Sequence, residues 1–156
     1  MRDRTGWAKI VREHLDLLNG FQLESLYNLI DPRDRNYLTR AIIECGVNPL
    51  NKLLTEIPEA MYYNIFDITE VKIPSTIESI GFASFANCKN LTTLILPKNI
   101  KMIEFRAFYR CRNLTHIIYE GTMAQWHSVA ENFGDEWYNE SPLKDIRCSD
   151  GTISMR

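Results

Sequence analysis

Hydrophobic positions between residues 68 and 113 follow one pattern that is written twice. The segment ITEVKIPSTIESIGFASFANCKN is followed by LTTLILPKNIKMIEFRAFYRCRN, and each copy has 23 residues. Aliphatic positions recur in phase, and so do a proline, two phenylalanines, a cysteine and an asparagine. Self-similarity at a period of roughly 20–50 residues is typical of a solenoid, in which each repeat stacks on its neighbours. The repeat therefore predicts a stack of short coils.

The phase continues on both sides of the two copies. Forward, LTHIIYEGTMAQW keeps the hydrophobic positions as far as Trp126, where the match ends. Backward, IPEAMYYNIFD, which starts at Ile57, matches the second half of a copy. We expect two whole coils and two half coils within residues 57–129, between a helical cap over residues 1–56 and a second cap over residues 130–156.

Each coil is predicted to open with a short strand, which Pro74 or Pro97 ends because proline has no N–H donor. A second extended stretch follows, and then a turn that we expect to insert two phenylalanines between coils. Asn90 and Asn113 are expected at corners, where their side chains can satisfy backbone groups. The residues predicted to point inward from the strands are Ile68, Val71, Ile73, Leu91, Leu94, Leu96, Leu114, Ile117 and Tyr119. The inserted phenylalanines are Phe82, Phe85, Phe105 and Phe108.

The order of these residues resembles one known family. An aliphatic pattern of the Leu-x-x-Leu-x-Leu type heads each whole unit, literally so at Leu91, Leu94 and Leu96. A proline follows the strand, and Ile-x-x-Ile-Gly and Ala-Phe-x-x-Cys-x-x-Leu come next. This pattern resembles the BspA-type (treponemal-type) leucine-rich repeat family, with Ser84 where the family usually has Ala and Glu104 where it usually has Gly. The resemblance covers about residues 57–126. It implies an α+β fold, a short leucine-rich-repeat solenoid of parallel strands, and binding as the class of function.

Residues 1–56 are predicted to be helical. An apolar stripe from Trp7 to Leu18 predicts one helix, and residues 21–30 predict a second. Asp31-Pro32 supplies an N-cap and a proline for a third helix, which stops at Gly46, and Asn48-Pro49 repeats the device. Because a solenoid end exposes apolar residues and strand edges, we interpret these helices as a cap.

The third helix also carries basic and polar residues. They are Arg33, Arg35, Asn36 and Arg40. The alternative interpretation is therefore a three-helix DNA-binding element, although Asp31, Asp34 and Glu44 interleave with the arginines and weaken any phosphate-facing stripe.

The segment after Trp126 is predicted to close the other end. A helix is expected through Val129, followed by an acidic stretch at 131–140 in which Phe133 and Trp137 cover the solenoid while the acids face water. Residues 145–148 are predicted to form a final strand. Asp150-Gly151 is a hairpin signal that returns the chain as a closing strand, and the family resemblance also implies a closing segment here.

Residues between the inward positions of a strand point outward. On this count the outer face of the strand sheet carries Glu70, Lys72, Thr93, Ile95, His116 and Ile118. Ile95 and Ile118 would be neighbours on a face that water should wet, which suggests a partner surface. The alternative is that the N-terminal helices or the tail fold over them.

The second whole coil is unusually basic. Its bases are Lys98, Lys101, Arg106, Arg110 and Arg112, against Glu104 alone. Such a cluster could engage an acidic protein or a phosphate backbone. The alternative is a solvated edge of the repeat.

Net charge and hydropathy narrow the function classes. The formal net charge of −2 gives no field that attracts nucleic acid or an acidic membrane. No stretch reaches the roughly 20 apolar residues of a membrane helix, and the charged first residues do not resemble a signal peptide. We expect a cytoplasmic location, although many members of the resembled family are exported to cell surfaces.

Four cysteines, Cys45, Cys88, Cys111 and Cys148, are too widely spaced for a C-x-x-C motif. Cys88 and Cys111 hold the same position in adjacent coils, so they should stack about 4.8 Å apart. Parallel Cβ directions and a reducing compartment favour buried free thiols over a disulfide.

No catalytic, cofactor-binding or metal-binding residue is predicted. His14, His116 and His127 have no neighbour at metal-ligand spacing, and the chain has no Gly-rich phosphate loop and no nucleophile elbow. Cys111, His116 and Asp145 could be assembled into a triad, but chance supplies such a trio in most chains.

We therefore expect a non-enzymatic module that binds another protein through the outer strand face and the basic coil. One alternative is a phage or mobile-element inhibitor of a host defence enzyme or nuclease, similar in role to an anti-CRISPR. Another is a nucleic-acid binder that uses the N-terminal helices and the basic coil. Fold by itself identifies no partner.

Overall fold

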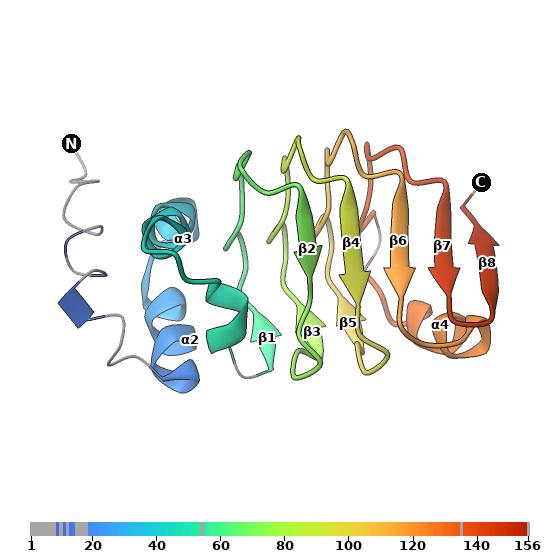
Figure 1. The fold of residues 1–156 in the computed structure, drawn as a ribbon, viewed down its shortest axis with the longest axis horizontal. Coiled ribbons are helices and arrows are strands. Elements are labelled where there is room, and N and C mark those ends of the chain that lie inside the picture. The colour runs from blue at the N-terminus through green and yellow to red at the C-terminus, as the bar shows by residue number, and fades with distance from the viewer. Residues whose placement is uncertain are drawn as a thin grey trace.

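The computed structural model describes residues 9, 11, 13–14, 19–53, 55–134 and 136–155. Strands of successive coils lie side by side, and α2 and α3 lie at the N-terminal end (Figure 1). The smaller sheet holds β1 (Glu56–Ile57), β3 (Ser79–Ile80) and β5 (Met102–Ile103), paired in parallel. The larger sheet holds, in order, β2 (Glu70–Lys72), β4 (Thr93–Leu96), β6 (His116–Tyr119), β7 (Asp145–Cys148) and β8 (Gly151–Ser154).

Strand register follows the repeat. Glu70 pairs with Thr93 and Thr93 with His116, so each residue pairs with its equivalent one repeat further along the chain. Pairs in the smaller sheet keep the same step. The predicted inward residues of β2, β4 and β6 are buried, namely Val71, Leu94, Leu96, Ile117 and Tyr119. The predicted α+β solenoid is confirmed.

A column of aromatic rings runs through the core, with one ring from each coil. Tyr62 stacks on Phe85 with ring centroids 4.8 Å apart, and Phe85 stacks on Phe108 at 5.1 Å. Trp137 meets Phe108 edge-on at 6.2 Å. Full burial of a phenylalanine stabilises a fold by about 1.5–3 kcal/mol. The column therefore contributes strongly to holding each coil on the next.

The prediction that Phe82 and Phe105 also insert between coils is wrong. Their side chains are 38% and 37% exposed, and their rings stack at the surface 5.9 Å apart. The backbone turns at the left-handed residue that follows each of them, so residues three positions apart in this turn face opposite sides. Phe85 and Phe108 take the inward side.

Thiol groups link successive coils in a fixed way. Cys88 Sγ lies 3.1 Å from the carbonyl oxygen of Tyr62, and Cys111 Sγ lies 3.1 Å from that of Phe85. Each thiol therefore donates to the coil before it. Both cysteines are free and buried, as predicted. Burial raises the pKa of the Cys111 thiol to about 12 and raises that of Cys88 well above its ordinary value.

The corner asparagines act as predicted. Asn90 Nδ2 donates to the carbonyl oxygen of Phe66 at 2.8 Å, and Asn113 Nδ2 donates to that of Lys89 at 2.8 Å. Each side chain thus satisfies a backbone acceptor of the preceding coil.

The prediction that the repeat pattern ends in a half coil at Trp126 is wrong, because the third coil closes after an insertion. α4 (Met123–Ala130) interrupts the coil, and the chain then returns to the stack. Gly134 N–H donates to Ile103 O at 2.7 Å, and Phe108 N–H donates to Trp137 O at 2.7 Å. In the coil before, Phe85 N–H donates to Ala107 O, so Trp137 lies more than one period beyond its equivalent, Ala107. A search of the sequence at a constant period of 23 residues could not detect this coil, because α4 lengthens it.

Two positions in each coil adopt positive φ although neither holds glycine. The first is held by Ala60, Ala83, Arg106 and Glu136, and the second by Asn64, Asn87, Arg110 and Glu140. A left-handed conformation costs a non-glycine residue roughly 1–2 kcal/mol. Contacts between coils must therefore stabilise these turns.

The helices predicted after residue 20 are present. α2 spans Gly20–Leu29, the 3₁₀ turn η2 Pro32–Asp34, α3 Arg35–Glu44 and the 3₁₀ turn η3 Pro49–Lys52. Asp31 accepts the Arg33 N–H and Asn48 accepts the Leu50 N–H, so both predicted N-caps are confirmed. Gly46 follows α3 with a φ of 77°. The helix predicted between Trp7 and Leu18 lies largely outside the described residues.

Side chains of α3 take the place of a coil before the first one. In later coils the carbonyl oxygens of Phe82 and Ser84 accept N–H groups of the preceding coil. Their equivalents in the first coil accept instead from α3: Arg35 Nη1 donates to Glu59 O at 2.8 Å, and Thr39 Oγ1 donates to Met61 O at 2.5 Å. The hydroxyl of Tyr27, from α2, lies 2.7 Å from Thr39 Oγ1 in the same buried network.

Two further side chains complete this contact. Arg40 Nη2 donates to Asn64 O at 2.9 Å, and a carboxylate oxygen of Glu24 accepts the Thr55 N–H at 3.1 Å, beside β1. The N-terminal helices thus supply both donors and acceptors to the first coil.

The C-terminal hairpin is confirmed. β8 pairs antiparallel with β7, and Cys148 pairs with Gly151. The two loop residues are therefore Ser149 and Asp150, one position before the predicted pair.

Replacing Phe85 by Ala should destabilise the fold by about 3–5 kcal/mol, because the change opens a cavity in the aromatic column. Phe82→Ala, in the same coil, is the matched control and should cost less than half as much because Phe82 lies at the surface. Urea unfolding of the full chain measures both. Equal losses would contradict the assignment of the inner and outer rings.

Thr39→Val should cost about 1–3 kcal/mol, because the isosteric change leaves Met61 O and the Tyr27 hydroxyl unsatisfied in the interior. Thr92→Val is the control. Thr92 Oγ1 also donates to a carbonyl of the preceding coil, that of Thr69 at 3.0 Å, but it is exposed. Thermal unfolding of both variants should show a clear loss for Thr39→Val and a small one for Thr92→Val.

Iodoacetamide at pH 8 should leave Cys88 and Cys111 unmodified in the folded chain, because both thiols are buried and their pKa values are raised. The half-buried Cys45 and Cys148 should react first, and all four should react in denaturant. Peptide mass mapping reads out each position. Rapid labelling of Cys88 under native conditions would show that the coils separate.

Candidate functional site

Six predicted residues lie together on the outward face of the larger sheet. Glu70, Thr93 and His116 form one row across β2, β4 and β6, and Lys72, Ile95 and Ile118 form the next. The strand directions in Figure 1 place this face on one broad side of the molecule. All six are exposed or half-buried, while the residues between them are buried.

Ile95 and Ile118 are register partners and form an aliphatic pair on this face. The Ile118 side chain is 39% exposed, which is high for a large aliphatic residue within a strand. The sequence left two alternatives for this pair, a partner surface or coverage by the N-terminal helices or the tail. In the described residues Ile118 is exposed and Ile95 is half-buried. The pair lies between Lys72 on β2 and Arg147 on β7.

Asp145 and Arg147 continue the two rows onto β7, and the sequence-based prediction missed both. Asp145 Oδ2 lies 2.8 Å from His116 Nδ1, and Asp145 Oδ1 accepts from Arg147 Nε at 3.2 Å. Residues 145–148 were predicted as a strand, but the step from His116 to its partner Asp145 is longer than one repeat, so the fixed period could not place them in register.

The larger sheet face carries both signs of charge beside its aliphatic centre. Lys72 Nζ lies 3.3 Å from a carboxylate oxygen of Glu120, across two coils. With the Asp145–Arg147 pair on the other side, the aliphatic residues are bordered by paired charges. The face can therefore offer apolar contact with a polar rim, the usual anatomy of a protein interface.

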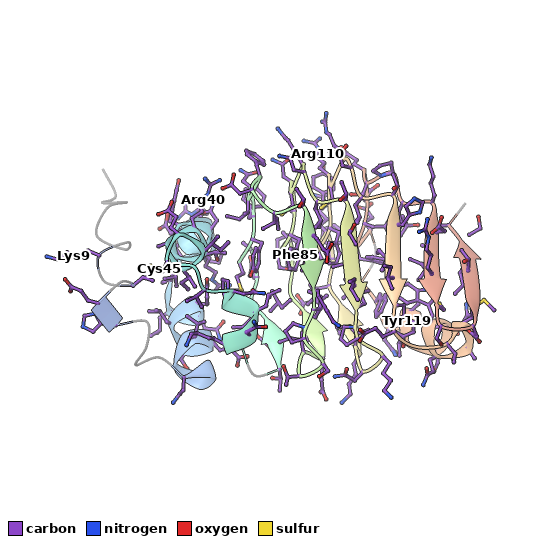
Figure 2. All side chains as sticks on the ribbon, in the orientation of Figure 1. Lys9, Arg40, Cys45, Phe85, Arg110 and Tyr119 are labelled. Atoms are coloured by element: carbon purple, nitrogen blue, oxygen red, sulfur yellow. The ribbon has the colours of Figure 1, made fainter. Side chains whose placement is uncertain are left out.

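The five bases of the basic coil are not all brought together, although Arg106 and Arg110 both lie over the Tyr109 ring, each 4.9 Å from its centroid. Lys98 follows β4, and its carbonyl oxygen accepts from the hydroxyl of Tyr119 at 3.1 Å. Tyr119 and Arg110 lie at opposite edges of the molecule (Figure 2). Lys98 thus lies near one edge, whereas Arg110 lies near the other.

Three of these bases are held in ion pairs with neighbouring coils. Lys101 pairs with Glu78 at 2.9 Å, Arg106 with Glu136 at 3.7 Å and Arg110 with Glu140 at 2.6 Å. Glu136 and Glu140 are exposed, as predicted for the acids at 131–140, and they also pair with these two arginines. Local neutralisation weakens the case for phosphate binding.

Arg110, Tyr109 and Glu140 form a surface cluster. Tyr109 donates its hydroxyl hydrogen to Glu140 at 2.7 Å, and the Arg110 guanidinium lies 4.9 Å from the Tyr109 ring centroid. The hydrogen bond with Glu140 raises the pKa of Tyr109, and the bond from Arg110 lowers the pKa of Glu140. Arg110 and Glu140 are exposed and Tyr109 is half-buried, so the cluster joins the third coil to the second at the surface.

The arginines predicted on the third helix are engaged by protein groups, although Arg35 also lines a pocket that it shares with Glu56, Glu59 and Glu104. Arg35 is buried and donates to Ile30 O and Glu59 O, and Arg40 donates to Asn64 O. Arg33 pairs with Asp31 at 2.7 Å. The DNA-binding interpretation is contradicted for Arg35 and Arg40, because their donors satisfy the first coil.

The trio of Cys111, His116 and Asp145 does not form a triad. His116 and Asp145 do pair, but the Cys111 thiol is buried and donates to the Phe85 carbonyl. A protonated thiol in the core offers no nucleophile. Within the described part of the chain, no three His, Cys, Asp or Glu side chains are grouped closely enough to hold a metal ion.

The described helices are all too short or too polar to cross a bilayer. No protein with a curated description matches the chain. A leucine-rich cell surface protein from Faecalibacterium prausnitzii A2-165, solved by crystallography, is 29% identical with a TM-score of 0.47, and the match covers 50% of this chain and 20% of that one. The chain therefore spans about a fifth of that protein's length.

The profile of the BspA type leucine-rich repeat region matches residues 55–155, in six copies. The matched range begins at the first turn of the solenoid and ends just after the strand β8, so it includes the third coil that the insertion lengthens. On this match, which covers well over half of its residues, the chain belongs to the BspA-type leucine-rich repeat family.

Proposed function

We propose that this chain is a non-enzymatic module that binds another protein through the outward face of its larger sheet. The observation that carries the proposal is the pairing of Ile95 with Ile118 on that face, where Ile118 is 39% exposed. Exposing adjacent aliphatic side chains to water is unfavourable, and contact with a partner removes that cost. Family membership supports protein binding as the class of function.

The site comprises the six predicted residues together with Asp145 and Arg147. A partner would contact the aliphatic pair centrally and the charged residues of both signs at the rim. Since rim charges affect specificity and association rate more than affinity, the two isoleucines are proposed as the main anchors.

Residues 1–56 are proposed to cap the solenoid, not to bind nucleic acid. The donors of Arg35, Thr39 and Arg40 support this role because they satisfy carbonyls that no coil precedes. The inhibitor hypothesis gains no support from the related proteins, and the cytoplasmic location stays a prediction.

Ile95→Asp combined with Ile118→Asp should weaken partner binding at least tenfold, because two charges would replace the apolar centre of the interface. The partner is first identified by placing the photo-crosslinker p-benzoylphenylalanine at position 118 in the full chain, exposing it to lysate of the source cells, and analysing the adduct by mass spectrometry. Affinity is then measured with the purified partner.

Phe82→Asp combined with Phe105→Asp is the matched control. These rings are about as exposed as Ile118, but they lie in the turns and not on the larger sheet. Binding should survive in this variant. Unchanged binding in the isoleucine variant, with its fold verified by circular dichroism, would refute the proposed face.

A further inference from the structure

β2 is the N-terminal edge strand of the larger sheet. The backbone N–H and C=O groups of Glu70 and Lys72 on this strand point away from its neighbour β4. Thr93 N–H donates to Thr69 O at 3.2 Å, and Ile73 N–H donates to Ile95 O at 2.9 Å. In a parallel ladder successive residues face opposite neighbours, so the N–H and C=O groups of Glu70 and Lys72 point outward from the edge. Among the described residues, no hydrogen bond reaches these four groups.

This open edge differs from the rest of the first coil. Beside β1 a carboxylate of Glu24 accepts the Thr55 N–H, and α3 donates to the carbonyls of Glu59 and Met61. Side chains of the N-terminal helices therefore form hydrogen bonds with backbone groups elsewhere in the first coil, at Thr55, Glu59 and Met61. Among the described residues, these helices provide no such partner to the backbone of β2.

A groove of about 320 Å³ runs beside this edge. Its other wall is the segment between α3 and η3. Apolar side chains dominate the lining, namely Ile43, Val47, Pro49, Leu50, Ile68 and Val71. Residues 47–49 stand one period before β2, but Asn48 caps η3 there, so the chain turns away and forms no strand. The space for one further strand thus lies between β2 on one side and the α3–η3 segment on the other, and no described strand occupies it.

We propose that this groove receives an extended segment of another protein, which adds to β2 as a further parallel strand. An added strand would satisfy the four backbone groups of Glu70 and Lys72, and its central side chain, opposite Val71, would enter the apolar lining. This second site shares the side chains of Glu70 and Lys72 with the rim of the outward face, but it does not use the isoleucine pair. A separate extended segment fits better than the folded sheet edge of a second copy, because the α3–η3 wall borders the groove.

Charge at the edge specifies the segment further. Glu70 has no ion-pair partner among the described residues, whereas Lys72 already pairs with Glu120. Directly opposed side chains favour opposite charge. The expected ligand therefore has a basic residue opposite Glu70, an aliphatic residue opposite Val71, and an acidic or neutral residue opposite Lys72.

Two synthetic peptides of identical composition test the proposal. The first, acetyl-ITKVEIP-amide, places opposite charges beside Glu70 and Lys72 when it pairs in parallel register. The second, acetyl-ITEVKIP-amide, copies residues 68–74 and places like charges there. With the full chain, calorimetry should show that the first peptide binds about fivefold tighter or more. Backbone amide resonances of Glu70 and Lys72 should shift on binding.

Matched variants locate the site. Lys72→Pro removes the outward N–H without breaking a bond to β4, and should weaken binding at least fivefold relative to Lys72→Ala, which keeps that donor. Glu70→Lys combined with Lys72→Glu should reverse the preference between the peptides. Ile118→Asp should leave peptide binding unchanged, so this site and the outward face can fail independently.

The proposal is overturned if neither peptide binds, if both bind equally, or if Lys72→Pro and Lys72→Ala bind alike. Sedimentation of the free chain supplies the last test. Self-association that either Lys72 variant abolishes would assign the edge to a second copy and would also overturn the proposal.

Discussion

Backbone hydrogen bonding between coils is the constraint on which this molecule depends. The hydrogen bonds within a single coil are confined to its turns, and its strand N–H and C=O groups pair with the coils before and after. Every coil therefore offers backbone donors and acceptors to both of its neighbours. At the two ends of the stack, one set of these N–H and C=O groups has no coil to pair with. At one end, side chains of α3 donate hydrogen bonds to the first coil, and at the other end β8 pairs antiparallel with β7.

Many charged side chains of this chain contact neighbouring coils and so are not free to bind a ligand. Bases of the second whole coil pair with acids of the coils on either side, and two arginines of α3 point into the protein backbone. Such pairs at the surface contribute little to stability individually. They do neutralise the patches that sequence inspection would assign to nucleic acid. What remains for recognition is apolar: the isoleucine pair on the sheet and the groove beside β2.

Sequence reasoning recovered the solenoid, the register and the outward residues because these follow from period and alternation. It assigned Phe82 to the core because a hydrophobic residue in a repeat is usually buried, and only the left-handed turn next to it decides otherwise. It missed Asp145 and Arg147 because α4 lengthens the third coil, which shifts the phase. Sequence reasoning assigned Arg35 to the surface. The sequence does not reveal that the carbonyl oxygen of Glu59, 24 residues away, accepts a hydrogen bond from this side chain.

The recurring left-handed residues have a consequence for assembly. Alanine, asparagine, arginine and glutamate occupy conformations that glycine would adopt freely, and they do so at the same two points of each coil. Asparagine tolerates this conformation, but alanine, arginine and glutamate do not favour it, so contacts with a neighbouring coil must stabilise the turns at those positions. Each coil would then adopt its final backbone conformation by packing on a coil that is already ordered. Folding would therefore start at an ordered end of the stack and proceed along it.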